Sequence, residues 1–139
     1  QGDDVLPGLP GGPTDRGGGV SDMKRARNGT KARNGTRIVG RIVARLRETY
    51  QPSQVFLFGS YAQGRQTRDS DLDLLIIKAT AKPFFQRLFE VRRLLFPLLR
   101  DQPFDPIVMT PQELERRLAR GDQFLQEIVR KGKLVYGKR

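Results

Sequence analysis

The sequence has no cysteine, no histidine and no tryptophan among its 139 residues. Without cysteine the chain forms no disulfide bond, which fits a reducing compartment and leads us to expect a cytoplasmic protein. Imidazole bases and thiolate nucleophiles are also excluded, so acid–base chemistry is left to carboxylates acting with a metal ion. The sequence lacks a run of about 18 apolar residues and a basic-then-apolar leader, so we expect neither a transmembrane helix nor a secretory signal.

Apolar side chains are scarce as well, at 37% of the chain, which predicts one domain with part of the sequence left unpacked. The segment before Met23 is rich in glycine and proline, and a basic arm follows it over residues 24–36. We therefore predict a disordered N-terminal tail over residues 1–36 and a folded domain over residues 37–139. Met23 is a candidate start residue, which leaves open whether residues 1–22 are native.

The net charge of +11 is unevenly distributed, because residues 23–50 hold nine basic side chains and one acidic side chain. Such a basic arm attracts nucleic acid, an acidic protein or nucleotides through its long-range field. The alternative is solvated charge that keeps the chain soluble. No aromatic residue interleaves with the arm over residues 24–36, so the sequence gives little support for recognition by base stacking.

The most informative feature is a pair of aspartates, Asp71 and Asp73, in the run DSDLDLLII. The apolar, branched residues from Asp71 to Ile77 predict a strand. Residues i and i+2 of a strand point to the same side, roughly 6.5–7 Å apart at their Cα atoms. Both carboxylates would then project from one face, and hard oxygen ligands of this kind suit Mg²⁺, which also binds substrate phosphates. Taken alone, such a pair is more often an exposed strand end.

A Gly-Ser turn lies twelve residues upstream of this pair, at Gly59 and Ser60. Glycine lets the backbone approach a phosphate closely, and a serine at the start of a short helix offers a hydroxyl and N–H groups to an anion. A turn suited to phosphate and a carboxylate pair suited to a cation, at this spacing, together indicate a binding site more strongly than either feature alone.

The pattern G-S-x-A-x-G-x-x-T-x-x-S-D-x-D-L-L from Gly59 to Leu75 resembles the DNA polymerase beta-like nucleotidyltransferases, and most closely their minimal members (MNT). The resemblance covers about residues 37–137. It implies Mg²⁺-dependent transfer of a nucleoside monophosphate, with AMP from ATP the favoured case, to a hydroxyl acceptor with release of pyrophosphate. In the two-metal arrangement that it implies, Asp71 and Asp73 hold the ions against the triphosphate.

The resemblance also assigns roles to residues around the pair. Those implied to contact the nucleotide are Gly59, Ser60, Arg65 and Ser70. The chain departs from the family pattern at Gln63, where arginine is frequent, so Arg65 or Arg68 becomes the candidate cation for the phosphates.

A third carboxylate is implied on a neighbouring strand, and Asp105 matches its position just before an apolar run. Asp105 would complete a metal site with Asp71 and Asp73 and help to remove the proton of the acceptor hydroxyl. On its own, Asp105 would be interpreted as a turn residue. The following Pro106 favours an edge strand or a strand start. Asp69 and Asp101 are expected to be solvated loop charges.

The remaining patterns predict an α+β, two-layer domain with a small mixed or antiparallel sheet backed by helices, the nucleotidyltransferase fold. A capping box at Thr110, Pro111 and Glu113 marks one helix start. The expected strands cover residues 54–58, 71–77, 104–109 and 133–136, and the expected helices cover residues 38–49, 82–99, 111–121 and 124–129.

Partners are indicated only indirectly. The phenylalanines of the helix over residues 84–99 are expected to be ordinary core residues, and the alternative is an exposed stripe for a partner. Members of the resembling family often pair with small helical HEPN proteins, and some transfer AMP to a hydroxyl of a HEPN toxin. The resemblance therefore implies a HEPN-type partner and an antitoxin role. A catalytically silent antitoxin or basic binding module is the alternative function, and homo-oligomerisation stays open.

Overall fold

The structure is a computed structural model that describes residues 35–139. Residues 37–139 form one structural unit. The predicted disordered tail and nearly all of the basic arm lie outside the described residues, so the predicted domain boundary stays a prediction. In the part of the chain that is described, no helix is both long and apolar enough to cross a bilayer.

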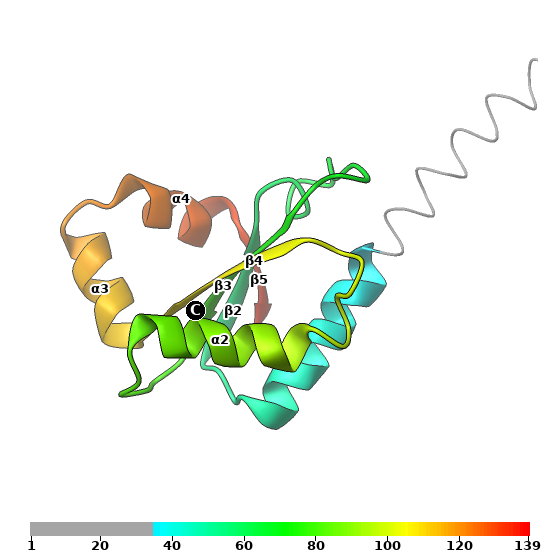
Figure 1. Cartoon of the computed structure of the whole chain (residues 1–139). Coiled ribbons are helices and arrows are strands. Elements are labelled where there is room, and N and C mark those ends of the chain that lie inside the picture. The colour runs from blue at the N-terminus through cyan, green and yellow to red at the C-terminus, as the bar shows by residue number, and fades with distance from the viewer. Residues whose placement is uncertain (1–34) are drawn as a thin grey trace, which may run out of the picture. The chain divides into compact units, whose positions relative to one another are not determined.

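Four strands form one sheet in the order β4-β3-β2-β5 (Figure 1). They are β2 (Gln54–Phe58), β3 (Leu72–Ile77), β4 (Phe104–Met109) and β5 (Lys133–Tyr136). β2 runs antiparallel to both β3 and β5, whereas β3 and β4 are parallel. The sheet is therefore mixed, one of the two predicted forms. Pro106 lies in the edge strand β4, where a missing N–H is tolerated.

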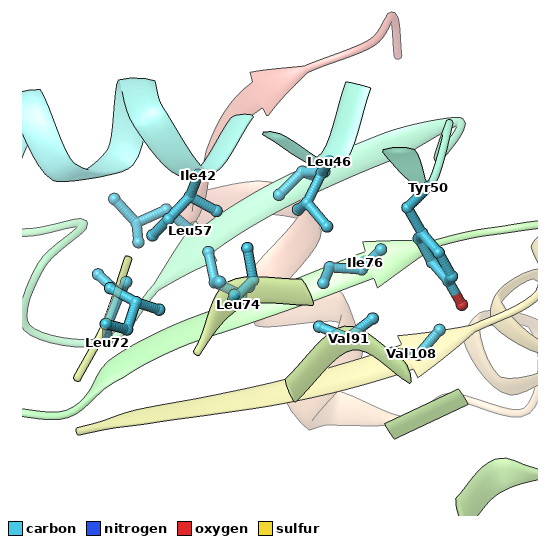
Figure 2. Packing of buried hydrophobic residues seen from close by; sticks show 12 residues of the cluster. Ile42, Leu46, Tyr50, Leu57, Leu72, Leu74, Ile76, Val91 and Val108 are labelled. Atoms are coloured by element: carbon cyan, nitrogen blue, oxygen red, sulfur yellow. The ribbon is translucent and has the colours of Figure 1, made fainter. Parts of the chain in front are cut away.

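Helices cover both faces of this sheet, because the central strand β3 is apolar on both of its sides. On one face, Leu74 and Ile76 pack under the helix over residues 35–49 and under α2 (Phe84–Leu95), as Figure 2 shows for this cluster. On the other face, Leu75 and Ile77 pack under α3 (Pro111–Ala119) and α4 (Gln123–Lys131). The predicted α+β fold is confirmed, with two helical layers around the sheet instead of one.

The start of α3 agrees with its prediction, since the hydroxyl of Thr110 accepts a bond from the Glu113 N–H and the Glu113 carboxylate accepts one from the Thr110 N–H. The end of α2 does not agree. This helix ends at Leu95, four residues before the predicted end, and turns follow through Leu99. Pro97 lacks an N–H and cannot continue the helix, so the helix ends before this proline and not after it as predicted.

The phenylalanines of α2 are a second correction. α2 buries Arg87, Val91 and Leu95, one residue per turn on the side facing the sheet. The three phenylalanines of α2 and the one that directly follows it are 49 to 80% exposed, so the prediction that they are core residues is wrong. The amphipathic pattern places arginine, not phenylalanine, among the buried positions. The exposed residues are Phe84, Phe85, Phe89 and Phe96.

Candidate active site

Two of the predicted carboxylates lie side by side on neighbouring strands. Asp73 is the second residue of β3, and Asp105 is the second residue of β4. The parallel register pairs these two residues directly. Asp71 lies just before β3, because the strand begins at Leu72 and not at Asp71 as predicted. The fold thus brings together three aspartates from two separate segments at one end of the sheet.

Asp73 is affected by the charges of both neighbouring aspartates. The pKa of Asp73 is raised above its ordinary value, first by burial of the carboxyl group and then by the negative charges of Asp105 and Asp71. Asp71 and Asp105 are both exposed. The amino end of β3 therefore holds one partly buried carboxylate near two exposed ones, and their negative charges repel each other.

Gly59 makes the close approach that its position predicted, but its neighbour is a carboxylate. Phe58 is paired with Asp73 across β2 and β3, so Gly59 leaves the sheet beside that aspartate. A Cβ atom on Gly59 would lie 2.3 Å from Oδ2 of Asp73, and φ of Gly59 is +75°. Both facts favour glycine over any other residue. The turn therefore passes close to the Asp73 carboxylate and leaves no room for a side chain at residue 59.

The segment after Gly59 is a run of turns from Gly59 to Gly64 and not the predicted short helix. The Ala62 N–H donates to the Gly59 carbonyl at 3.1 Å, and the Arg65 N–H donates to the Ser60 carbonyl at 3.0 Å. Gly64 has φ of +68°, which ends this single coil of backbone. The sequence is too rich in polar residues and glycine to extend it further.

The other residues implied to contact nucleotide lie on the same loop. Arg65 is exposed and donates to the side-chain oxygen of Gln63. The Ser70 hydroxyl accepts a bond from the Thr67 N–H at 2.8 Å, which shapes the loop before Asp71. These positions are compatible with the predicted contacts, and the roles of Ser60, Arg65 and Ser70 stay predictions.

A wide groove of about 630 Å³ opens on the side of Asp71 and Asp105. One wall is the last turn of α2, where Nη2 of Arg92 lies 4.0 Å from Oδ1 of Asp105. The Arg92 guanidinium also lies 5.2 Å from the ring centroid of Phe104. Sequence reasoning missed Arg92 because it lies outside the motif, on a helix far from it in sequence. Asp101 is exposed, as predicted, at the edge of this groove.

A second, smaller pocket of about 270 Å³ is lined in part by Gly59. It lies between the turn at Gly59 and α4 and includes Gln63, Phe124 and Lys131. Gly59 separates it from the Asp73 carboxylate.

The donor set suits a hard divalent cation, since clustered carboxylates that repel each other are relieved by a cation between them. Among residues 35–139, no three acidic side chains are already arranged as the ligands of one ion. Asp71, Asp73 and Asp105 are the groups that would hold it. A bound nucleotide would have to contribute further oxygen ligands.

The model of the nucleotidyltransferase domain family matches residues 39–135. No curated protein sequence matches the chain.

Solved structures with the same fold include a toxin–antitoxin protein with AMP-PNP, which is 27% identical, with a TM-score of 0.54 over 73% of this chain and 74% of that one. A mutant of the toxin–antitoxin pair MntA–HpeT is 25% identical, with a TM-score of 0.52 over 73% of this chain and 74% of that one. A Sulfolobus solfataricus protein described as a nucleotidyltransferase is 20% identical, with a TM-score of 0.54 over 80% of this chain and 88% of that one, which supports the fold alone. With a family match over most of its length and a carboxylate cluster beside a glycine turn, this chain belongs to the nucleotidyltransferase domain family, as one of its minimal members.

Proposed function

We propose that this nucleotidyltransferase transfers AMP from ATP to a hydroxyl group of a partner protein in a Mg²⁺-dependent reaction. The observation that carries the proposal is the direct pairing of Asp73 with Asp105, next to a glycine that passes close to the Asp73 carboxylate. A carboxylate held in this way has no cationic partner on its own strand and repels its neighbours. Such an arrangement costs stability unless it binds a cation.

The three aspartates would have different tasks. Asp71 and Asp73 would hold Mg²⁺ beside the triphosphate. Asp105, whose side chain is 66% exposed to the groove, would face the acceptor and take the proton of its hydroxyl. When bound, Mg²⁺ supplies charge neutralisation and alignment of the phosphates. The acceptor oxygen would form a bond to the α-phosphorus, the bond to the β-phosphate oxygen would break, and pyrophosphate would leave.

The acceptor is proposed to be a toxin protein of the HEPN type. Support comes from the two neighbours that are toxin–antitoxin proteins, one of them with AMP-PNP. The groove of about 630 Å³ next to Asp105 is open enough to admit a side chain carried by another protein. The transferred nucleotide would then silence the toxin.

The test is transfer of label from ATP labelled on its α-phosphate to the protein encoded beside this chain, with Mg²⁺ present. We expect labelling by the wild type, its loss in EDTA, and a decrease of roughly a thousandfold in Asp73→Asn or Asp71→Asn, because each change removes a cation ligand. Asp69→Asn is the matched control, since Asp69 is an exposed acidic residue of the same loop.

The alternative is a catalytically silent antitoxin that acts by contact alone. It predicts that the partner is neutralised equally by the wild type and by Asp73→Asn, with no label on either protein. That result would contradict the proposed transfer. Neutralisation that requires both ATP and Asp73 would contradict the contact model.

A further inference from the structure

The side of α2 that is turned away from the sheet (green in Figure 1) carries a row of exposed phenylalanines. Phe85, Phe89 and Phe96 are separated by four and then seven residues, so they lie on one side of a helix. Phe96 follows the last residue of α2 but keeps helical backbone angles, φ −51° and ψ −45°, so it continues the row. The three side chains are 80%, 63% and 59% exposed, and no described element of the chain covers them. We call these three residues the aromatic row.

The extent of the aromatic row sets it apart from an ordinary surface. Single exposed apolar side chains are normal, whereas contiguous apolar patches mark binding sites. The row extends over roughly 16 Å at 1.5 Å per helical residue. The ring of Phe84 lies edge-on to that of Phe85, with centroids 5.5 Å apart, which widens the apolar surface at one end. A straight surface of this length fits the apolar side of another helix laid along α2.

The aromatic row ends at the wide groove beside Asp105. Phe96 is the last member of the row and also lines that groove, together with Arg92 and Asp105. Arg92 lies between Phe89 and Phe96 in the chain, and its guanidinium reaches to 4.0 Å from the Asp105 carboxylate. A molecule that covers the row therefore extends to the groove. Since the proposed function places the acceptor hydroxyl in this groove, the acceptor protein is the occupant that both features favour.

The exposed charge of α2 is positive. Its one acidic residue, Glu90, pairs with Lys82, and Arg87 is buried and bonded to Glu113. Arg92 and Arg93 remain exposed, and among residues 35–139 Arg93 has no ion-pair partner. These charges favour a partner that carries acidic residues beside its apolar ones.

A second copy of this chain fits the aromatic row less well. A two-fold contact centred on the row would bring Arg92 and Arg93 of both copies into one interface, and like charges brought together oppose association. The helix offers no carboxylate to compensate them, because Glu90 already pairs with Lys82.

We propose that the aromatic row of α2 is the docking surface for the acceptor protein, which covers it with the apolar side of a helix bordered by acidic residues. The inference rests on the proposed function, because that function supplies the acceptor. Docking on the row would select which protein presents a hydroxyl group to the aspartates. The binding energy that chooses the substrate would thus come from a surface outside the reacting groups.

The test measures, by calorimetry, binding of the full chain to the protein encoded beside it, without nucleotide. We expect Phe89→Ser to weaken this binding about thirtyfold, because a central aromatic residue often dominates the affinity of an interface. The variant should bind AMP-PNP with Mg²⁺ as the wild type does and melt at the same temperature, since this side chain is exposed. Phe124→Ser is the matched control, a 54% exposed phenylalanine of α4 on the opposite face of the sheet.

The charge beside the row is tested by a second variant. Arg93→Glu should weaken binding about tenfold and reduce its dependence on salt, because the acidic border of the partner would then be repelled. Arg130→Glu is the matched control, since Arg93 and Arg130 are both exposed arginines in the last turn of a helix.

Three results would overturn the inference. The first is equal binding of the neighbouring protein by the wild type and by Phe89→Ser, and equally fast labelling of that protein by both would show that the proposed transfer survives. The second is no binding by the wild type. The third is a wild-type chain that is dimeric by light scattering and monomeric as Phe89→Ser, which would assign the row to a second copy. Conversely, binding that depends on Phe89 without any labelling in ATP and Mg²⁺ would contradict the proposed transfer and support the docking surface.

Discussion

The two ends of β4 present acidic side chains in opposite electrostatic settings. After its carboxyl end, Glu113 accepts two bonds from Arg87, at 2.7 and 3.1 Å, and one from the Thr110 N–H at 2.9 Å. These bonds lower the pKa of Glu113. At its amino end, Asp105 lies beside Asp73, whose pKa is raised by burial and by neighbouring carboxylates.

The carboxyl end of β4 thus holds an ion pair that stabilises the fold, whereas the amino end holds carboxylates that repel each other. Arg87 is nearly buried, and besides Glu113 it donates to the carbonyl oxygen of Lys82, so it joins α2 to the start of α3. Among the residues that the structure describes, no comparable cation is bonded to Asp73. Selection for stability alone would not retain such a group, whereas selection for binding a cation would.

At the amino end of β4, where Asp105 lies beside Asp73, the largest effect is expected from Gly59→Ala. The added Cβ would lie 2.3 Å from Oδ2 of Asp73, so the carboxylate must move, and we expect nucleotidyl transfer to fall roughly a hundredfold or more. Gly64→Ala is the matched control. It has a similar positive φ, +68°, in the same run of turns, but an added Cβ there meets no atom within 4 Å. Equal losses in both variants would show that backbone strain alone explains the effect.

At the carboxyl end of β4, Arg87→Met should lower the stability of the fold without acting directly on the transfer reaction. The change leaves Glu113 without its ion pair, and we expect a loss of about 2–3 kcal/mol in the free energy of unfolding, because the 35% exposure of Glu113 lets water replace part of the bond. Urea unfolding measures it. Adding Glu113→Gln should recover part of the loss. A loss below about 0.5 kcal/mol would contradict a structural role for the pair.

The same pair predicts a pH dependence with a definite sign. Because Arg87 lowers the pKa of Glu113 below its ordinary value of 4.5 in the folded state, the carboxylate stabilises the fold above that value. This contribution should be lost as the pH falls through the lowered pKa. Urea unfolding across the acid range should show a steeper loss for the wild type than for Glu113→Gln. Parallel curves would contradict the assignment.

The smallest expected effect concerns the cap of α3. Thr110→Ala removes the hydroxyl that accepts a bond from the Glu113 N–H at 3.1 Å, and we expect a loss of about 1 kcal/mol. Thr110→Ser keeps the hydroxyl and should retain most of the stability. Transfer activity should not change in either variant, since this cap lies at the end of β4 away from Asp105.

The features that sequence could predict were local ones. The strand over Gln54–Phe58, the capping box at Thr110 and the terminal strand over Lys133–Tyr136 follow from short apolar runs and cap residues, and the structure agrees with them. The aspartate pair was also visible, because its spacing of two residues is a local pattern. The family resemblance supplied Asp105.

The missed features depend on tertiary packing. Whether a phenylalanine of α2 is buried depends on which side of the helix meets the sheet, and Arg87 occupies that side because Glu113 is there to receive it. Arg92 lines the groove beside Asp105, and it comes from a helix outside the motif. No spacing rule connects Arg92 to the motif, so only the fold could bring it there.

The most direct test of the central claim is the thermal stability of the wild type and of Asp73→Asn, each measured in EDTA and in Mg²⁺ with AMP-PNP. Because the raised pKa means that the Asp73 charge costs stability at neutral pH, Asp73→Asn should be the more stable protein in EDTA. Mg²⁺ with AMP-PNP should raise the melting temperature of the wild type and leave that of Asp73→Asn unchanged. A variant that is less stable in EDTA, or that gains as much from Mg²⁺ and AMP-PNP as the wild type, would contradict the claim that these aspartates are held in place for a cation.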